Sequence, residues 1–395
     1  MIQDRNRQSV SSHNPLQVCF VAHFAYGALA GGERGHIGGV ERQTSLMAKW
    51  LAGRGHRVSL ITWDEGQTDG EIIDGVQVFK LCRKDAGIPG LRFFRPRWSS
   101  LNAAMKRADA DVYYHNCGEY VTGQVAMWCR RHGRKFVYSV ASDPDCDVRL
   151  PEMRSLRERV LYRYGLKRAD RVIVQTRRQQ QMLLEGFARD SLVIPMPCPG
   201  PSDAEYAACD RNRNGSQRVL WIGRICEVKR PDRLLDLAQM RPEVHFDLVG
   251  PAGESEYARK VCERARTLKN VTVHGPASRD RVADFYQRAK VMCCTSDFEG
   301  FPNTFLEAWS YGVPIVSTVD PDGLIAGKSL GAVGTDVPQL AAGIRELLAS
   351  SQQWRRASQT AREYFAANHA IDKAMARFER VFCEVVDSSV RRTGS

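Results

Sequence analysis

The amino-acid sequence predicts an α/β protein built from two doubly wound domains. Its 395 residues are too many for one ordinary core and suit two domains of the usual size. Short apolar runs alternate with helix-compatible segments in both halves, which is typical of parallel sheets covered by helices. The segment 194–203, IPMPCPGPSD, separates the two series and, with four prolines and a glycine, fits neither a helix nor a strand.

These features give a predicted domain organisation. We expect a loose polar tail over 1–14, a first domain over 15–196, a linker over 197–205 and a second domain over 206–365. A C-terminal helix and tail over 366–395 should pack back toward the first domain. The tail 1–14 has no apolar stretch of the kind found in secretion signals, so we expect a cytoplasmic protein.

The first half opens with a strand–loop–helix–strand pattern. An apolar strand over 16–24 follows Pro15, and a Gly-rich loop over 27–39 comes next. Val40, Met47 and Leu51 then recur at helical spacing, and glycines end this helix before a strand over 57–62. Further strands are expected at 111–114, 135–140 and 171–175.

The second half repeats the alternation. Strands are expected at 218–223, 246–250, 271–275, 291–296 and 313–319. Helices are expected at 231–239, 254–267, 279–288 and 304–311, and residues 338–386 should be helical throughout. This order predicts a second doubly wound sheet.

Composition excludes several classes of protein. Hydrophobic residues make up 43%, charged residues 26%, and the mean hydropathy is -0.38, which is typical of a folded chain and not of a disordered one. No apolar run approaches the roughly 20 residues that cross a bilayer. The twelve cysteines form no C-x-x-C pair, which argues against a zinc or redox site.

The net charge of +12 is concentrated in the first half, over residues 80–108 and 149–178. Such basic segments suit an anionic lipid surface, a phosphorylated acceptor or nucleic acid, but a charge run is more often a solvated face. The sequence contains none of the common nucleic-acid-binding motifs, so we expect no nucleic-acid partner.

Two polar clusters in the second half follow strands, where open parallel sheets bind ligands. The first, 223–232 (GRICEVKRPD), precedes a helix, and its Arg224 and Lys229 are suited to holding a diphosphate. A solvated turn is the alternative. The second cluster, 297–308 (DFEGFPNTFLEA), contains Glu299 and Glu307, and these two carboxylates could be an acid and base pair. Asn303 is predicted as the N-cap of the helix that follows. Glu307 would then lie in the first turn of this helix, where a structural acid is the alternative interpretation.

These clusters also carry a resemblance. Glu299 and Glu307 form an E-x7-E motif, and EGFPNTFLEAWSYGVPIVST together with GRICEVKRPDRLL resembles the large retaining glycosyltransferase family 4, which has the GT-B fold. In the first half, GGVERQTSLMAKWLAGRGHRVSLIT is similar to that family's opening glycine loop, helix and second strand. The resemblance covers residues 16 to about 365 and implies two Rossmann-like domains facing across a cleft.

The resemblance also implies roles for individual residues. Arg224 and Lys229 would grip the diphosphate of a nucleotide sugar, Glu299 would face the transferred sugar, and Glu307 would bind the ribose hydroxyls. Further donor contacts would come from backbone or strand ends at Gly38, Gly39, Gly223, Gly250, Gly275, Gly300, Phe301, Asn303 and Thr304.

One departure from the family lies near Ala141, where many members carry a histidine. His115 or Asp143 would take over part of that role, or this chain would work without it. Two D-x-D triplets, 143–145 and 320–322, match the metal-binding pattern of another glycosyltransferase fold, but we interpret both as turns. We therefore expect neither a metal nor a cofactor beyond the nucleotide sugar.

The expected activity is retaining transfer of a hexose-type sugar from a UDP- or GDP-sugar to an acceptor hydroxyl. The acceptor would be a saccharide or a lipid-linked molecule in the synthesis of cell-surface polysaccharide or glycolipid, with the basic segments at the inner face of the membrane. The alternatives are a non-catalytic GT-B protein that binds sugar nucleotides, a basic nucleic-acid-binding protein, and a GT-B epimerase or phosphorylase.

Overall fold

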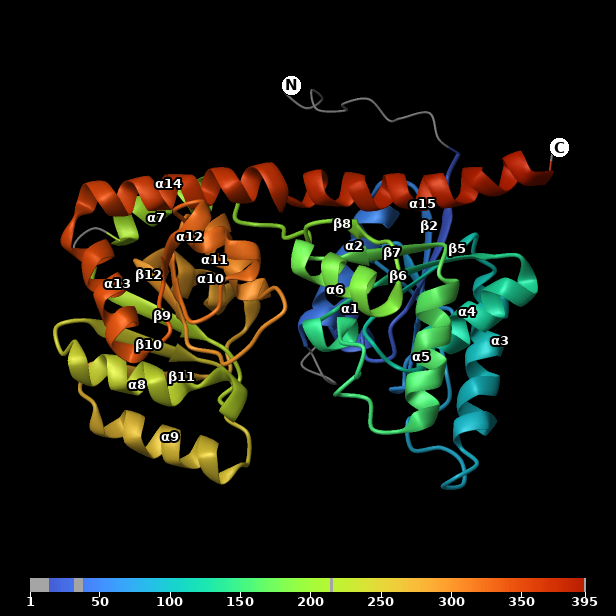
Figure 1. Ribbon diagram of the computed structural model, residues 1–395, viewed down its shortest axis with the longest axis horizontal. Helices are drawn as coiled ribbons and strands as arrows, with labels where there is room; N and C mark the ends of the chain where they lie inside the picture. The colour runs from blue at the N-terminus through green and yellow to red at the C-terminus, as the bar shows by residue number, and fades with distance from the viewer. Residues whose placement is uncertain (1–13, 32–37, 214–215, 394–395) are drawn as a thin grey trace. The chain divides into compact units, whose positions relative to one another are not determined.

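The computed structural model describes residues 14–31, 38–213 and 216–393 and divides the chain into two compact units (Figure 1). Unit 1 contains the chain up to Val174, residues 182–192 and the chain from Met375 onward. Unit 2 contains residues 175–181 and 193–374. Most of the predicted N-terminal tail and part of the predicted glycine loop, residues 32–37, lie outside the described residues.

Unit 1 is built on an eight-stranded sheet in the order β3-β4-β2-β1-β5-β6-β7-β8. Neighbouring strands from β4 to β7 pair in parallel, and β3 pairs antiparallel with β4. The strands are β1 (Gln17–Val21), β2 (Arg57–Thr62), β3 (Ile72–Ile73), β4 (Val76–Lys80), β5 (Val112–Asn116), β6 (Lys135–Ser139), β7 (Arg171–Val174) and β8 (Leu192–Val193).

Helices enclose this sheet (Figure 1). They are α1 (Tyr26–Ala30), α2 (Gly39–Gly53), the irregular turn η1 (Phe93–Trp98), α3 (Ser99–Ala108), α4 (Tyr120–His132), the 3-10 turn η2 (Asp143–Cys146), α5 (Leu156–Arg168), α6 (Arg177–Phe187) and α15 (Ile371–Thr393). The residues of α6 before Met182 and those of α15 before Met375 belong to unit 2. Although α15 comes last in the chain, its fully buried Phe378 and Phe382 pack on Tyr114 of β5, with ring centroids 6.4 and 5.9 Å apart. This helix therefore completes the core of unit 1.

Unit 2 is built on a six-stranded sheet in the order β11-β10-β9-β12-β13-β14, in which every pairing is parallel. Its strands are β9 (Arg218–Ile222), β10 (His245–Val249), β11 (Val271–Gly275), β12 (Val291–Cys294), β13 (Ile315–Ser317) and β14 (Gly331–Val333). Its helices and turns are α7 (Asp203–Arg213), η3 (Glu227–Lys229), α8 (Pro231–Met240), α9 (Glu256–Thr267), α10 (Arg279–Arg288), α11 (Asn303–Ser310), η4 (Pro321–Gly323), α12 (Leu324–Gly327), α13 (Val337–Ala349) and α14 (Ser351–Asn368).

The core of unit 2 lies between the sheet and the helices that cover it. Val219 and Trp221 of β9 and Phe246 of β10 are buried in one apolar cluster with Leu234 and Leu235 of α8. Because parallel strands are covered on both faces, they are apolar in runs and not in alternation, which is why the sequence pattern identified them. The predicted α/β class with two doubly wound domains is confirmed.

Several local predictions differ from the structure. A short helix, α1, overlaps the start of the predicted loop 27–39, and the strands β3, β4, β8 and β14 were not predicted. Residues 338–386 are not helical throughout, because α13 ends at Ala349 and α14 ends at Asn368. In the second half, α11 begins at Asn303 with Pro302 at the N-cap position, so Asn303 is not the cap. Within the described ranges, we find no helix with the combination of length and apolar character that crossing a bilayer requires.

Candidate functional site

The predicted donor residues of unit 2 gather at the carboxyl ends of β9, β10, β11 and β12. Gly223, which follows β9, donates its N–H to the carbonyl of Val249 at 3.0 Å, and Gly250 donates to the carbonyl of Gly275 at 2.9 Å. These hydrogen bonds place Gly223, Gly250 and Gly275 side by side. Gly250 has φ +140°, and a Cβ there would lie 1.9 Å from the Gly223 carbonyl oxygen, so only glycine fits without a backbone shift.

Two of the predicted charged residues meet at this edge. Lys229, at the end of η3, donates a hydrogen bond from its ammonium group to Oε1 of Glu299, and Ser296 Oγ donates to the same oxygen at 2.7 Å. The Lys229 side chain is 30% exposed and that of Glu299 is 14% exposed. The chain segments after β9 and β12 thus bring a cation and a carboxylate into one partly open site, because these two strands are neighbours in the sheet.

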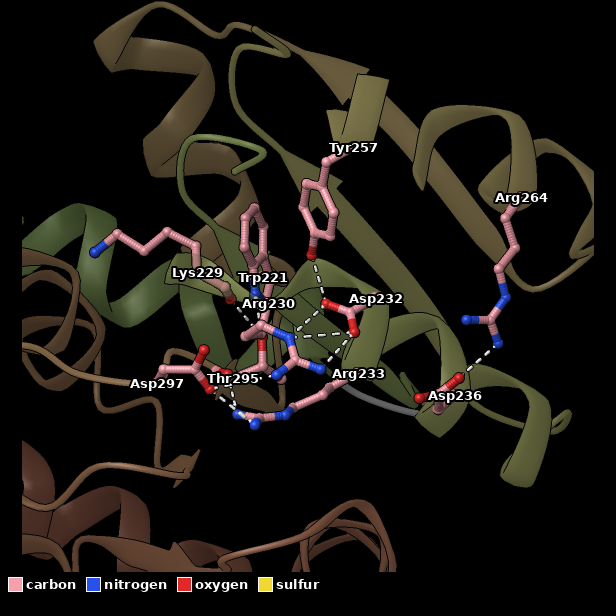
Figure 2. A network of polar contacts seen from close by, with 10 residues as sticks. All are labelled: Trp221, Lys229, Arg230, Asp232, Arg233, Asp236, Tyr257, Arg264, Thr295 and Asp297. Carbon is pink, nitrogen blue, oxygen red and sulfur yellow. Dashed lines mark hydrogen bonds and ion pairs between the residues drawn. The ribbon is translucent and has the colours of Figure 1, made fainter. Parts of the chain in front are cut away.

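A set of buried hydrogen bonds fixes the backbone of this loop (Figure 2). Trp221 Nε1 donates to Thr295 Oγ1, and Thr295 Oγ1 donates to the backbone carbonyl of Lys229, each at 2.9 Å. The N–H of Asp297 donates to the carbonyl of Val228, also at 2.9 Å. Lys229 is therefore held by its main chain, and its side chain pairs with Glu299.

The neighbouring arginines are already paired within the protein (Figure 2). Arg230, at φ +47°, contacts Asp232 with Nε–Oδ1 and Nη2–Oδ2 distances of 3.0 and 2.8 Å. Tyr257 donates to Asp232 at 2.5 Å, and Arg233 pairs with Asp297 at 2.8 Å. Partial burial opposes ionisation of Asp232, but the hydrogen bonds from Arg230 and Tyr257 hold its pKa below the usual value.

Arg224 differs from these arginines. It lies in the exposed loop between β9 and η3, and in the parts of the chain that are described no acidic side chain pairs with it. The Arg224 guanidinium is therefore available to an anionic ligand at the end of the sheet.

Gly300 and Phe301 lie in the loop between β12 and α11, and the Phe301 ring packs 5.4 Å from that of His369.

Glu307 lies on α11, four residues after Asn303 and one after Leu306, so it belongs to the second turn. The prediction of a structural acid in the first turn is therefore wrong. Glu307 Oε2 accepts a hydrogen bond from the hydroxyl of Tyr286 at 2.8 Å, and the same hydroxyl is 3.4 Å from the carbonyl of Thr304. Burial, followed by the nearby Glu307 charge, raises the pKa of Tyr286 well above its usual value, which keeps this hydroxyl a donor.

The predicted residues of the first half lie in unit 1. Gly38 is the N-cap of α2 and Gly39 its first residue. His115 of β5 is 1% exposed, and its Nδ1 lies 2.7 Å from the carbonyl of Val21, while its Nε2 lies 3.6 Å from Glu119. Burial lowers the pKa of His115 to about 4, so it is neutral at neutral pH and has little surface to offer a ligand.

Two further acidic residues of unit 1 have shifted pKa values, Glu119, which the sequence analysis did not single out, and Asp145, which it named only as part of a D-x-D triplet. Asp145 is 4% exposed, and Oδ2 accepts hydrogen bonds from the N–H groups of Ala141 and Ser142 at 3.1 and 3.2 Å. Burial raises the pKa of Asp145 to about 6 in spite of these bonds. Desolvation and the charge of Asp145 raise the pKa of Glu119 to about 7. For Glu119 the sequence signal is that it follows the strand β5, and Asp145 follows β6 within the D-x-D triplet.

Carboxylates of both D-x-D triplets accept hydrogen bonds from backbone N–H groups. Asp143 and Asp145 belong to η2, and Asp145 caps the turn as described. Asp320 accepts from the N–H of Ile325 at 2.7 Å, and Asp322 accepts from the N–H of Arg177 at 2.6 Å. Within residues 14–31, 38–213 and 216–393, no group of three or more His, Cys, Asp or Glu side chains is arranged to hold a metal ion.

Comparisons with known proteins match both halves of the chain. The family model described as glycosyl transferases group 1 matches residues 210–364, and the model described as glycosyl transferase 4-like domain matches residues 38–199. The D-inositol 3-phosphate glycosyltransferase of Mycolicibacterium vanbaalenii is 28% identical over 275 residues, which cover 63% of this chain and 60% of that protein. The corresponding protein of Mycobacteroides abscessus is 26% identical over 344 residues, which cover 79% and 76%.

The matched part of the first relative is thus less than two thirds of its length, and for the protein of Mycolicibacterium gilvum the matched part is 41%. Solved structures resemble nearly the whole chain. Sucrose-phosphate synthase from Thermosynechococcus elongatus superposes with a TM-score of 0.76 at 19% identity, over 94% of this chain and 99% of that one. Anabaena Alr3699/HepE in complex with UDP gives 0.73 at 17% identity, over 93% and 100%. These likenesses confirm the predicted fold.

Proposed function

Both halves of this chain belong to glycosyltransferase family 4 with its GT-B fold, and from that premise we propose that it is a retaining hexosyltransferase. It moves a sugar from a UDP- or GDP-linked donor to an acceptor hydroxyl. The observation that carries this proposal is the meeting of Lys229 and Glu299 at the carboxyl ends of β9 and β12. A cation for the leaving diphosphate and a carboxylate for the sugar are the two charges that this reaction needs.

Negative charge builds on the diphosphate as its bond to the sugar breaks. Fixed positive groups at that position lower the barrier because they bind the transition state more strongly than the ground state. Arg224 and Lys229 supply these groups. Lys229 lies beside Glu299 through their ion pair, and the flexible stem of Lys229 lets its ammonium group reach the phosphate.

Glu299 and Glu307 act on different parts of the donor. Glu299 faces the transferred sugar, and Ser296 keeps its carboxylate in place at 2.7 Å. Glu307 holds the ribose hydroxyls with one oxygen while Tyr286 orients the other. Backbone groups at Gly223, Gly250, Gly275, Gly300, Phe301, Asn303 and Thr304 complete the donor site, and Gly38 and Gly39 stay proposed donor contacts on the family resemblance alone. His115 and Asp143 remain the proposed residues for the role of the family histidine.

We propose that transfer needs no divalent cation, because Arg224 and Lys229 neutralise the diphosphate as a metal would. The test is turnover after treatment with EDTA. Equal rates with and without EDTA are expected, and activity that is abolished by EDTA and restored by manganese would contradict the proposal.

The experiment that tests donor binding is a thermal melt of the full chain with UDP, GDP or ADP. A ligand that binds only the folded state stabilises it by about 2.7 kcal/mol at a hundred times its Kd. One uridine or guanosine nucleotide should raise the Tm, and Lys229→Gln should reduce this shift. The matched control is Lys260→Gln, since Lys260 is also paired with an acid, Glu256, at 2.8 Å but lies on α9.

A full-length chain that melts at the same temperature with every nucleotide would refute the proposal. Nucleotide binding without hydrolysis of any UDP- or GDP-sugar would instead support a non-catalytic binding protein. For the acceptor we propose a saccharide or lipid-linked molecule of cell-surface polysaccharide or glycolipid synthesis, used in the cytoplasm at the inner face of an anionic membrane. We propose no nucleic-acid partner.

A further inference from the structure

Unit 1 exposes large apolar side chains on two adjacent segments. One is η1 with the two residues before it, and the other is α5. Leu91 and Phe94 are 63% and 57% exposed, and Leu156 and Val160 of α5 are 78% and 57% exposed. Between these segments lies an open groove of about 420 Å³, which we call the η1–α5 groove. It is lined by Phe93, Phe94, Trp98, Leu156, Arg157, Val160 and Leu161.

The exposed face of α5 changes from apolar to cationic along the helix. Leu156, Val160, Arg163 and Lys167 follow one another at intervals of four, three and four residues, so they lie on one side of the helix, and all are exposed. The one acidic residue of α5, Glu158, accepts hydrogen bonds from the N–H groups of Arg154 and Ser155, each at 3.1 Å, and is committed to the capping box.

The opposite side of α5 is already packed against α4. A Cβ on Gly123 of α4 would lie 2.3 Å from the carbonyl oxygen of Leu161, and one on Gly165 of α5 would lie 2.5 Å from that of Thr122. The two helices therefore touch backbone to backbone, and Tyr162 and Leu166 of α5 are buried. Burial on this side fixes the rotation of α5, so the exposed side chains remain on the surface.

Cations also border the groove. The guanidinium of Arg157 lies 3.8 Å from the centroid of the Phe93 ring, and Arg95 and Arg154 are exposed nearby in the sequence. Arginine and lysine can bury their aliphatic stems in an interface while their charged ends remain with phosphate groups. This face carries both apolar side chains and cations, and α5 has no free acid on it. The apolar side chains suit the acyl chains of a lipid bilayer, and the cations suit its anionic headgroups.

We propose that the η1–α5 groove and the cationic half of α5 form the surface by which this protein docks on an anionic lipid bilayer. Leu91, Phe94, Leu156 and Val160 enter the interfacial region, and the arginines and lysine contact lipid phosphate. This inference deepens the membrane contact of the proposed function by assigning it to named residues. Its test measures no sugar transfer, so the two proposals can fail separately.

The experiment is flotation of the full chain with phosphatidylcholine vesicles, with and without phosphatidylglycerol. Wild-type protein should float with the anionic vesicles and lose binding as salt is added. Arg163→Gln with Lys167→Gln should weaken binding roughly twenty-five-fold, at about fivefold for each cation. Leu156→Ser with Val160→Ser should weaken it by roughly tenfold or more, and the remaining binding should stay sensitive to salt.

Two control variants match these changes away from the groove. Arg259→Gln with Lys260→Gln removes two cations of α9, which are 62% and 67% exposed, and Ile72→Ser removes an apolar side chain that is 70% exposed. Both should float like the wild type. All variants should keep the wild-type melting temperature and the same nucleotide-induced shift.

Equal partition of the wild type onto neutral and anionic vesicles at low salt would overturn the proposal. So would wild-type binding by the Leu156 and Val160 variant, because the groove would then not enter the bilayer. A concentration-dependent dimer in sedimentation that this variant abolishes would assign the groove to a second copy of the chain and would also overturn it.

Discussion

Replacing Glu299 with glutamine is the most direct test of the proposed chemistry. The carboxylate accepts hydrogen bonds from Ser296 and Lys229, and glutamine keeps the shape and a carbonyl oxygen for Ser296 while removing the charge. Positive character develops on the sugar ring only as the glycosidic bond stretches. Loss of the charge should therefore act on the transition state more than on the bound donor.

The expected loss of kcat is on the order of 10² to 10³, as for the removal of one preorganised electrostatic group. The expected loss of stability is much smaller. Lys229 is 30% exposed, so the pair is partly screened and contributes about 1 kcal/mol or less to the free energy of unfolding. For a domain of this size that corresponds to a fall in Tm of about 2 to 4 °C. A large kinetic effect with a small thermal effect is the predicted signature.

The assay is steady-state kinetics with varied donor, accompanied by a melting curve. Glu263→Gln is the matched control, because Glu263 also pairs with a basic residue, Arg259 at 2.9 Å, but lies on the exposed face of α9. It should change neither kcat nor Tm. Unchanged kcat in Glu299→Gln, or a loss confined to donor KM, would refute the assignment of this carboxylate to the reacting sugar.

Three further predictions concern positioning, backbone packing and pH. Tyr286→Phe removes the hydroxyl that donates to Glu307 at 2.8 Å, so, like Glu307→Gln, it should raise donor KM several-fold with little change in kcat; a loss wholly in kcat would contradict the ribose role. Gly250→Ala places a Cβ 1.9 Å from a carbonyl oxygen and should destabilise the protein by about 2 to 4 kcal/mol in urea unfolding, whereas Gly275→Ala, at φ +66° with open space, should cost about 1 kcal/mol. Burial lowers the pKa of His115 from 6.5 to about 4, so its contribution to stability is present above pH 6.5 and is lost as the pH falls toward 4. Urea unfolding of His115→Asn at pH 7 and pH 5 should therefore show a weaker loss of stability on acidification than the wild type, and equal losses would count against it.

The fold was largely predictable because both sheets are covered on both faces. Continuous apolar runs such as Val219 to Trp221 mark their strands without ambiguity, and the helix predicted over 279–288 matches α10. Short elements were not predictable. Helix α1 has five residues within a glycine-rich stretch, which is too short to show a helical period.

The charged residues of the candidate site were predictable, but their pairing was not. Lys229 and Glu299 are 70 residues apart in the sequence, and they meet because β9 and β12 are neighbours in the sheet. The order of strands in a sheet cannot be deduced from the sequences of the strands alone. The orienting role of Tyr286 likewise depends on how α10 is rotated against α11. Pro302 shows a third limit, since a helix can begin after proline without the side-chain cap that Asn303 suggested.

The position of α15 has a consequence for the biosynthesis of the protein. Tyr114 of β5 is covered by Phe378 and Phe382, and His56 is 2.8 Å from Glu379. When the ribosome has made the last strand of unit 1, about 180 residues remain before this helix emerges, a delay of roughly ten to forty seconds at common rates of translation. During that interval the first unit carries an open apolar face while the whole of the second is being synthesised. A stop codon that removes only α15 should therefore destabilise the domain made first.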